Sequence, residues 1–430
     1  MRIPDFLKKL LLDRLLDLED TLVFNQYEDQ AVDWERIENL YIHIPFCRNK
    51  CLYCPYFKKT YQEQKAWFFG ESLLREIELH AWWLKGKEMQ SLYIGGGTPT
   101  LMTNLLIQAV EKLSALCILK NIALETTPAE INNRVLVELH HMGCNMISLG
   151  VQDFHQKYLS SIGRNYLVAD TLKVIEKIGL LYYDTFNLDL IFAFPGQTIQ
   201  ELDKTLHMAM ATPAHQLTFY PLFTFPYSTI GRFKQLKKVI MPDGLTRKRM
   251  YYHICDKLLG NGYKQVSVWS FLKGGKDKYS SVTRDTYLGL GPSAGTFTGK
   301  QFLFNTFHMN DYISLPLHNR IPTAYIMNIT PNMERLFWIY WRLYETAIPL
   351  TAYKDRFGSE FCDDFNHWLW LADKLHYTVK KDNHIVLTKK GIHRVHLLQN
   401  HFSLDYINRI WTACTQDPPP SKVPLCTWCA

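Results

Sequence analysis

The sequence has no uninterrupted apolar run of the roughly 18 residues that a membrane-spanning helix requires. It also lacks a low-complexity tract and any repeat of fixed period. The first twenty residues are rich in leucine, but Asp13, Asp17, Glu19 and Asp20 interrupt the apolar centre that a secretory signal needs. We therefore expect no membrane span, a cytoplasmic location and an amphipathic helix at the N-terminus.

Cysteine is scarce, at ten residues in 430, which is typical of a protein without a disulfide framework. Net charge is modest, since 48 Lys and Arg stand against 41 Asp and Glu, and no acidic or basic tail gathers it. A balance of this kind suits contact with small anionic molecules and is weak evidence for nucleic acid. The length accommodates one large domain and a smaller one.

Three of the few cysteines, Cys47, Cys51 and Cys54, nevertheless lie within eight residues, in the stretch LYIHIPFCRNKCLYCPYFKK. An odd number disfavours a disulfide, and a structural zinc site needs four ligands, usually as two spaced pairs. A [4Fe–4S] cluster held by three thiolates, with one iron left open, fits best. From the cysteines alone, buried apolar thiols remain an equal alternative.

The stretches around the cysteines alternate between strand and helix. Short apolar strands that end in polar residues recur in YIGGGTPT, IALETTPAEI, MISLGVQDF, NLDLIFAFPGQT and LTFYPLF, with helical patterns between them. This order predicts an α/β fold, a partial (β/α)6 barrel. Glu125, Gln152 and Asp189 fall at strand ends, where such barrels place their chemistry.

The ordered set YIHIPFCRNKCLYC, YIGGGTPT, ETTPAEI, ISLGVQDF, LDLIFAFPGQT and GLGPSAG resembles the radical S-adenosylmethionine (SAM) enzymes, specifically the family of oxygen-independent coproporphyrinogen oxidase and its relatives, over roughly residues 40–315. The resemblance implies that Cys47, Cys51 and Cys54 bind a [4Fe–4S] cluster and that SAM chelates its open iron. It also implies reductive cleavage of SAM to a 5′-deoxyadenosyl radical, with electrons from a flavodoxin or ferredoxin, and a monomer acting on a tetrapyrrole or aromatic substrate.

The same resemblance assigns cofactor contacts. The glycine-rich turn would meet the methionine part of SAM through backbone N–H groups and a hydroxyl, carboxylates would accept hydrogen bonds from the ammonium or ribose, and a guanidinium would pair with the SAM carboxylate. The positions concerned are Tyr41, Gly96, Gly97, Thr98, Glu125, Gln152, Arg164, Asp189 and Gly295. For each alone, a helix cap, a tight turn or a surface ion pair is the structural alternative.

The sequence departs from its relatives in two places. Tyr56 stands where the founding oxidases have a further cysteine, and KYSSVTRDTYLGLG lacks the His-Asn and Tyr-Trp pairs of the haem-chaperone branch. By exclusion we expect class C methyl transfer, with a second SAM, and keep coproporphyrinogen dehydrogenation and haem carriage as alternatives. Tyr220 and Trp269 are expected to stack on adenine or a flat substrate, with core packing as the equal alternative.

The expected domains are an N-terminal helical segment (1–40), the barrel (41–303), a connector (304–330) and a helical, winged-helix-like domain (331–430). A winged helix suggests DNA binding, but the scattered lysines there more simply solvate a surface, and we expect no nucleic-acid partner. Cys117, Cys144, Cys255 and Cys362 are expected in the core. Cys426 and Cys429 form a CxxC in a flexible tail.

Overall fold

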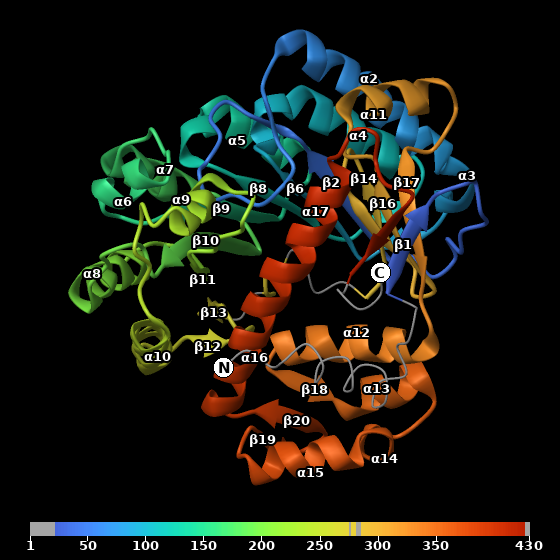
Figure 1. Ribbon diagram of the computed structural model, residues 1–430. Helices are drawn as coiled ribbons and strands as arrows, with labels where there is room; N and C mark the ends of the chain where they lie inside the picture. Colours follow the sequence, from blue (N-terminus) through green and yellow to red (C-terminus); the bar gives the residue numbers. More distant parts are fainter. Residues whose placement is uncertain (1–21, 275–276, 281–284, 426–430) are drawn as a thin grey trace.

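Six parallel strands form the centre of the structure, a computed structural model that describes residues 22–274, 277–280 and 285–425 (Figure 1). The strands pair in chain order, and the helices that follow them cover their outer side. The strands are β2 (Asn39–Ile44), β6 (Ser91–Gly96), β8 (Ile122–Thr126), β9 (Met146–Gln152), β10 (Thr185–Phe192) and β11 (Gln216–Pro221). The helices are α2 (Glu63–Leu79), α4 (Thr103–Ser114), α5 (Asn133–His141), α7 (Val168–Gly179), α8 (Ile199–Met210) and α10 (Gly244–Gly260). The expected partial (β/α)6 barrel is therefore confirmed.

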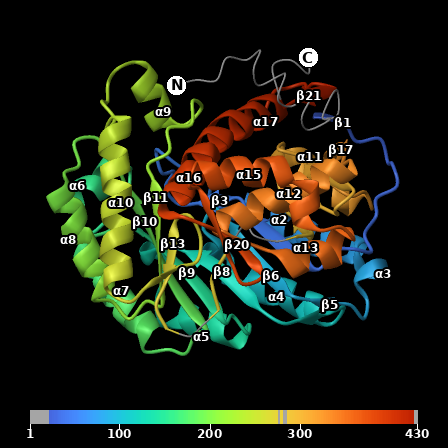
Figure 2. The same ribbon diagram turned by 90° about the horizontal axis from the view of Figure 1, so that it is seen from below.

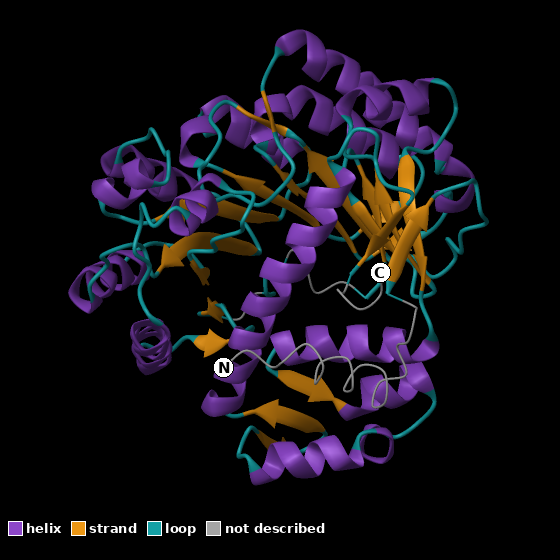
Figure 3. Ribbon diagram, viewed as in Figure 1, coloured by secondary structure: helices purple, strands orange, loops and turns teal. Residues whose placement is uncertain are grey.

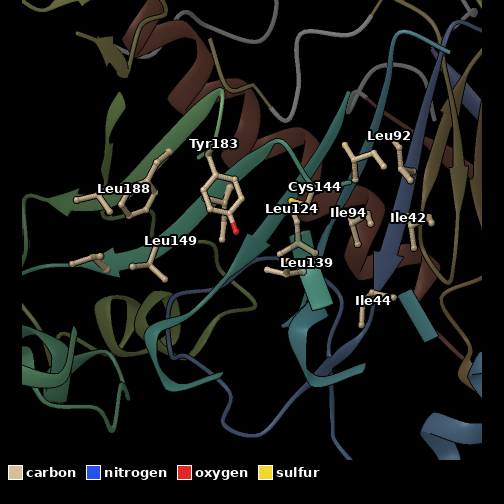
Figure 4. Packing of buried hydrophobic residues seen from close by; sticks show 14 of the residues in the cluster. Ile42, Ile44, Leu92, Ile94, Leu124, Leu139, Cys144, Leu149, Tyr183 and Leu188 are labelled. Atoms are coloured by element: carbon tan, nitrogen blue, oxygen red, sulfur yellow. The ribbon is translucent and has the colours of Figure 1, made fainter. Parts of the chain in front are cut away.

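The two faces of these strands differ because side chains alternate along a strand. The outward residues, such as Ile42, Ile94 and Leu124, are fully buried against the helices, and Leu139 of α5 packs onto them (Figure 4). The inward residues are aromatic or polar and stand at paired positions. They include Tyr41 opposite Tyr93, Glu125 opposite Ser148, and Asp189 between Gly150 and Thr218.

Both sides of the parallel strands continue into antiparallel ones. β14 (Tyr287–Leu290) lies parallel to β2, and beyond it come β15 (Gly295–Phe297), β16 (Gln301–Asn305), β17 (Thr323–Asn328), β1 (Val23–Gln26) and β21 (Lys422–Pro424). On the other side β13 (Ser270–Leu272) and β12 (Lys264–Gln265) follow β11. Together with the six parallel strands, these strands form one 14-stranded sheet.

Two segments differ from the sequence expectation, and a third lies outside the described residues. The expected N-terminal helix over 1–40 lies outside the described residues as far as residue 21, and the part that follows contains the strand β1. The expected connector at 304–330 is no free linker, because it holds α11 (Met309–Leu317) and β17 of the main sheet. The Cys426–Cys429 tail also lies outside the described residues.

The C-terminal part is a smaller unit of helices around the three-stranded antiparallel sheet β18–β20–β19 (Figure 3). Its elements are α12 (Pro331–Tyr344), β18 (Ala347–Pro349), α13 (Leu350–Phe357), α14 (Phe361–Asp364), α15 (Asn366–Lys374), β19 (Thr378–Lys381) and β20 (His384–Leu387). α16 (Lys389–Phe402), a π-helical turn (Ser403–Ile407) and α17 (Asn408–Cys414) then lead back along the barrel (Figure 2). Among the described helices, none combines the length and apolar character needed to cross a membrane.

Candidate functional site

The loop that carries the three cysteines lies between β3 (Phe46–Cys47) and β4 (Lys59–Thr60). Backbone hydrogen bonds fix it from two sides, since the Leu52 N–H donates to the Ile162 carbonyl and the Leu52 carbonyl accepts from the Ile230 N–H, each over 3.1 Å. The hydroxyl of Tyr227 also donates to the Pro55 carbonyl over 2.9 Å. A loop without regular secondary structure is thus held in place by neighbouring elements of the barrel.

The thiols of this loop influence one another electrostatically. Burial raises the pKa of Cys47 to about 11, a hydrogen bond from the Thr98 hydroxyl to its Sγ (3.6 Å) opposes the shift, and Cys54 and Cys51 add to it. Burial also raises the pKa of Cys51, while the Arg164 guanidinium lowers it. Within the described part of the chain, no three His, Cys, Asp or Glu side chains are already gathered around one point as metal ligands.

The chemistry of these donors fits an iron–sulfur cluster. Thiolates are the protein ligands of such clusters, and three of them leave one iron without a protein ligand. Cys117, Cys144 and Cys255 are buried as expected of core cysteines, whereas Cys362 is only half-buried.

Arg164 stands beside the cysteine loop with part of its guanidinium unused. Its Nη1 donates to the Thr127 hydroxyl over 2.8 Å and its Nη2 to the Tyr53 hydroxyl over 3.2 Å. Its Nε is buried and has no hydrogen-bond partner among the described residues. A buried guanidinium with a free donor is suited to a carboxylate ligand.

The glycine-rich turn after β6 has a different role from the one its sequence suggested. The N–H groups of Gly97 and Thr98 donate to the Ile44 and Phe46 carbonyls over 2.6 and 2.8 Å, so they are engaged within the protein. A Cβ at Gly97 would stand 2.4 Å from the Phe46 carbonyl oxygen. Gly96 has a φ of +108°, which favours glycine. The turn thus locks the start of the cysteine loop against β6.

Glu125 faces the barrel interior at the end of β8 and is linked to two tyrosines. The Tyr93 hydroxyl donates a short hydrogen bond to Oε1 of Glu125, and the Tyr279 hydroxyl donates to that of Tyr93 over 2.9 Å. Burial raises the pKa of Glu125 to about 7, the Tyr93 hydrogen bond lowers it and the charge of Asp189 raises it further. Glu125 therefore exchanges its proton near neutral pH.

Asp189 of β10 is the second interior carboxylate. Ser148 Oγ donates to its Oδ2 over 2.8 Å, and Asn187 Nδ2 donates to its Oδ1 over 2.9 Å. Burial raises its pKa to about 6, although both hydrogen bonds and then Arg164 oppose the shift. Gln152 lies nearby at the end of β9 with a φ of +71°, at the point where the register of β9 against β10 shifts.

A cavity of about 410 Å³, counted with the part that opens to solvent, brings the two carboxylates together. Tyr93, Tyr220 and Tyr279 line it from the barrel, and Tyr344 and Glu345 line it from the C-terminal unit. Lys278 also lines it and pairs with Glu345, so Glu125 and Asp189 are the carboxylates of the lining without a cationic partner there, beside the aromatic rings. A cavity of this composition suits a cationic or hydroxyl-rich ligand with an apolar ring.

The two remaining candidates, Tyr41 and Gly295, do not line this cavity. The Tyr41 hydroxyl is 2.7 Å from His43 Nδ1, and its ring lies 6.0 Å from that of Tyr93. The carbonyl of Gly295 packs against Gly289, where a Cβ would stand 2.1 Å from it, so Gly295 belongs to the packing of β14 on β15.

The two aromatic candidates, Tyr220 and Trp269, have different surroundings. Tyr220 lines the cavity, but Trp269 is buried outside its lining and donates from Nε1 to His396 Nδ1 over 2.8 Å. For Trp269 the core-packing alternative therefore holds. Tyr56 is half exposed, and after burial the charges of Glu125, Cys54 and Asp189 raise its pKa, so its hydroxyl lies towards them.

Sequence reasoning missed Tyr93, Tyr279 and Gln216. Tyr93 was detectable, because it alternates with the apolar residues of β6 and must face the interior. Tyr279 was not, because it comes from a loop 186 positions further along the chain. Gln216 fixes that loop with two hydrogen bonds to the Tyr279 backbone, each 3.0 Å long.

The chain is similar to known proteins both in sequence and in fold. Residues 41–209 match the family model of the radical SAM superfamily. The chain is 24% identical to the heme chaperone HemW of Lactococcus lactis over 87% of its own length and 99% of that protein, and 26% identical to the heme chaperone HemW of Bacillus subtilis over 66% and 78%. It is 27% identical to the oxygen-independent coproporphyrinogen III oxidase of Pseudomonas aeruginosa, over 64% of each chain. The solved structure of coproporphyrinogen III oxidase (HemN) from Escherichia coli superposes with a TM-score of 0.73 at 22% identity, covering 88% of this chain and 95% of that one.

Proposed function

Because this chain belongs to the radical SAM family of oxygen-independent coproporphyrinogen oxidase-like proteins, we propose that it cleaves SAM reductively in tetrapyrrole metabolism. The observation that supports this most is the position of Glu125 and Asp189 on one cavity, from the two strands β8 and β10 that flank β9, with Arg164 close enough to influence both Asp189 and Cys51 of the cysteine loop. The family's cofactors are a [4Fe–4S] cluster and SAM, and the cluster supplies the electron that breaks a carbon–sulfur bond of SAM.

The chemistry of each residue suits a different part of binding the cluster and SAM. Cys47, Cys51 and Cys54 would hold the cluster as thiolates. Because burial raises the pKa values of Cys47 and Cys51, binding of the cluster releases protons from them and is favoured at alkaline pH. Arg164 pairs through its free Nε with the SAM carboxylate.

Glu125 and Asp189 accept hydrogen bonds from the ammonium or the ribose hydroxyls of SAM. Tyr41, in the middle of β2, and Gln152, at the end of β9, would lie against the same ligand. Gly96, Gly97 and Thr98 act indirectly, by fixing the cysteine loop, and Gly295 acts through the close packing of β15 on β14.

The substrate class is a tetrapyrrole, because the relatives are named for coproporphyrinogen III and for heme. Methyl transfer, which the sequence favoured by exclusion, has no support among these relatives and is not part of the proposal. The founding oxidases have an additional cysteine where this chain has Tyr56, and this difference counts against decarboxylation of coproporphyrinogen. Decarboxylation is therefore one of two candidate functions, and haem carriage is the other.

The second candidate is haem carriage, favoured by the 99% coverage of the L. lactis heme chaperone. One experiment separates the two. Anaerobically reconstituted protein is incubated with SAM and dithionite, alone and with coproporphyrinogen III or haem, and 5′-deoxyadenosine and tetrapyrrole products are measured by mass spectrometry. An enzyme yields a changed tetrapyrrole and more 5′-deoxyadenosine in its presence. A carrier binds haem, seen as a shifted Soret band, and leaves it unchanged. Absence of both SAM cleavage and haem binding would refute the proposal.

A further inference from the structure

Positive charge is concentrated in two segments of the chain. Residues 48–65 and 223–249 together contain twelve of the 48 Lys and Arg, but only two of the 41 Asp and Glu, Glu63 and Asp243. Their excess of ten positive charges is larger than the net charge of +7 of the whole protein. The other nine-tenths of the chain are therefore slightly acidic.

These two segments are far apart in the sequence and adjoin in the structure. The first contains the cysteine loop, and the second contains α9 (Thr229–Gln235) with the turn that leads to α10. The Ile230 N–H donates to the Leu52 carbonyl over 3.1 Å, and the Tyr227 hydroxyl donates to the Pro55 carbonyl over 2.9 Å. The tertiary structure thus joins the two basic segments into one surface around Cys51 and Cys54. We call it the basic face.

Most of the cations of the basic face are exposed and unneutralised. Arg48 pairs with Glu130, but for Lys50, Lys59, Lys237 and Lys238 the described part of the structure contains no ion pair. The charges also repel one another: after burial, Lys50 and Lys65 lower the pKa of Lys59. Burial and then Arg247 lower the pKa of Lys234 in the same way. Binding of an anionic partner would reduce this repulsion and is therefore electrostatically favourable.

Apolar side chains are exposed among these cations. Ile240 is 85% exposed and Leu236 65%, although both types are usually covered. An apolar centre within a charged rim is the composition of a protein–protein interface. Nucleic acid would need only the positive charges and not the apolar centre. A lipid surface would need a longer apolar face than these side chains provide.

We propose that the basic face docks an acidic protein that carries single electrons to the cluster. The proposal rests on the proposed function, because Cys51 and Cys54 lie within the face and are the ligands assigned to the cluster. In the step concerned, the carrier is oxidised by one electron and the cluster is reduced by one, with no bond or proton exchanged. Charge complementarity would orient the carrier with its redox centre towards the cysteine loop.

The test uses the double variant Lys237→Glu, Lys238→Glu and the control Lys380→Glu, Lys381→Glu, which reverses an equally exposed neighbouring pair on β19 of the C-terminal unit. A bacterial flavodoxin, an acidic one-electron carrier, is the probe. Its dissociation constant is measured by calorimetry at low and high salt, and SAM cleavage is driven either by photoreduced flavodoxin or by dithionite.

We expect the Lys237, Lys238 variant to bind flavodoxin on the order of tenfold more weakly at low salt, with a smaller salt dependence. Flavodoxin-driven cleavage should fall by a similar factor, while dithionite-driven cleavage and iron content stay those of the wild type. The control should match the wild type throughout.

Three results would overturn the inference: equal flavodoxin binding by wild type and variant, loss of dithionite-driven activity together with flavodoxin-driven activity, or tighter binding of a single-stranded oligonucleotide or of phosphatidylserine vesicles than of flavodoxin. A wild type that binds flavodoxin through this face but cleaves no SAM with dithionite would refute the proposed function and leave the docking surface standing.

Discussion

The hydroxyl of Tyr279 donates to the hydroxyl of Tyr93 over 2.9 Å, and Tyr93 in turn donates to Glu125. A residue of a late loop thereby reaches a carboxylate at the end of the third parallel strand. The loop is itself held by Gln216, which also contacts Asn187, the partner of Asp189. The two interior carboxylates therefore share one hydrogen-bonded support.

The Tyr93→Phe variant tests this support. Without the donor, the ionised form of Glu125 loses a hydrogen bond, so its pKa rises further and less of it is charged at neutral pH. We expect SAM to bind about tenfold more weakly near pH 7, since a hydrogen bond to a charged group contributes ~1.5–3 kcal/mol. The difference should shrink at pH 8.5, where Glu125 ionises in both proteins. Calorimetry of SAM binding across pH 6–8.5 measures it, with Tyr182→Phe on the surface as control. A loss of affinity independent of pH would indicate general loosening of the barrel instead.

Loss of single cysteines should separate cluster ligands from core thiols. Replacing Cys47, Cys51 or Cys54 by Ala should abolish the visible absorption of the anaerobically reconstituted protein, since each supplies one of three thiolates. Cys117→Ala and Cys255→Ala remove buried thiols outside the cysteine loop and should keep the wild-type iron content, with a lower melting temperature only. Iron content that survives in the Cys51 variant would argue against this ligand set.

Gly97 provides a test of the glycine-rich turn. A Cβ there would stand 2.4 Å from the Phe46 carbonyl oxygen, so Gly97→Ala must push β6 away from the start of the cysteine loop. We expect a loss of about 1–3 kcal/mol in the free energy of unfolding of the apoprotein, measured by urea denaturation. At Gly244 a Cβ has no atom within 4 Å, and Gly244→Ala should be close to neutral. Unchanged apoprotein stability with weaker SAM binding would instead restore the direct role that the sequence suggested for this glycine.

The stability of the apoprotein should depend on pH through the interior carboxylates. The folded pKa values of Glu125 and Asp189 are about 7 and about 6, above the ordinary values of ~4.3 and ~3.9 in an unfolded chain. Between these limits the folded state holds more protons, so stability is fully present at low pH and is lost as the pH rises through the folded pKa values. The part of the free energy of unfolding that these carboxylates contribute should therefore be smaller at pH 8 than at pH 5.5, and it is read from urea denaturation as the difference between the wild type and a variant without the carboxylate. The total also contains a contribution of opposite sign from His43, His80 and His396, whose pKa values burial lowers.

The Glu125→Gln variant should remove part of that pH dependence, because an amide does not ionise. Glu63→Gln, at the exposed first turn of α2, should leave the slope as it is in the wild type. An identical slope in the Glu125 and wild-type proteins would assign the effect to other groups, of which Glu76, with a pKa raised by burial to about 7, is the nearest in kind.

The sequence by itself determined the barrel, the cysteine loop and the family, because each is a local pattern. Strand and helix periodicity are written in consecutive residues, and Cys47, Cys51 and Cys54 stand within eight positions. It also predicted Glu125 and Asp189 at strand ends; Glu125 stands next to the end of β8, whereas Asp189 stands three residues before the end of β10, and both face the barrel interior.

Only the tertiary structure decided how these residues are used. The Gly97 N–H is taken by the Ile44 carbonyl, Trp269 is turned to His396 of α16, and Tyr279 reaches Tyr93. Each relationship joins segments whose distance and orientation depend on the packing of the whole chain, so no local pattern encodes it. The same holds for the basic face, where residues 48–65 and 223–249 combine their charges only because α9 packs on the cysteine loop.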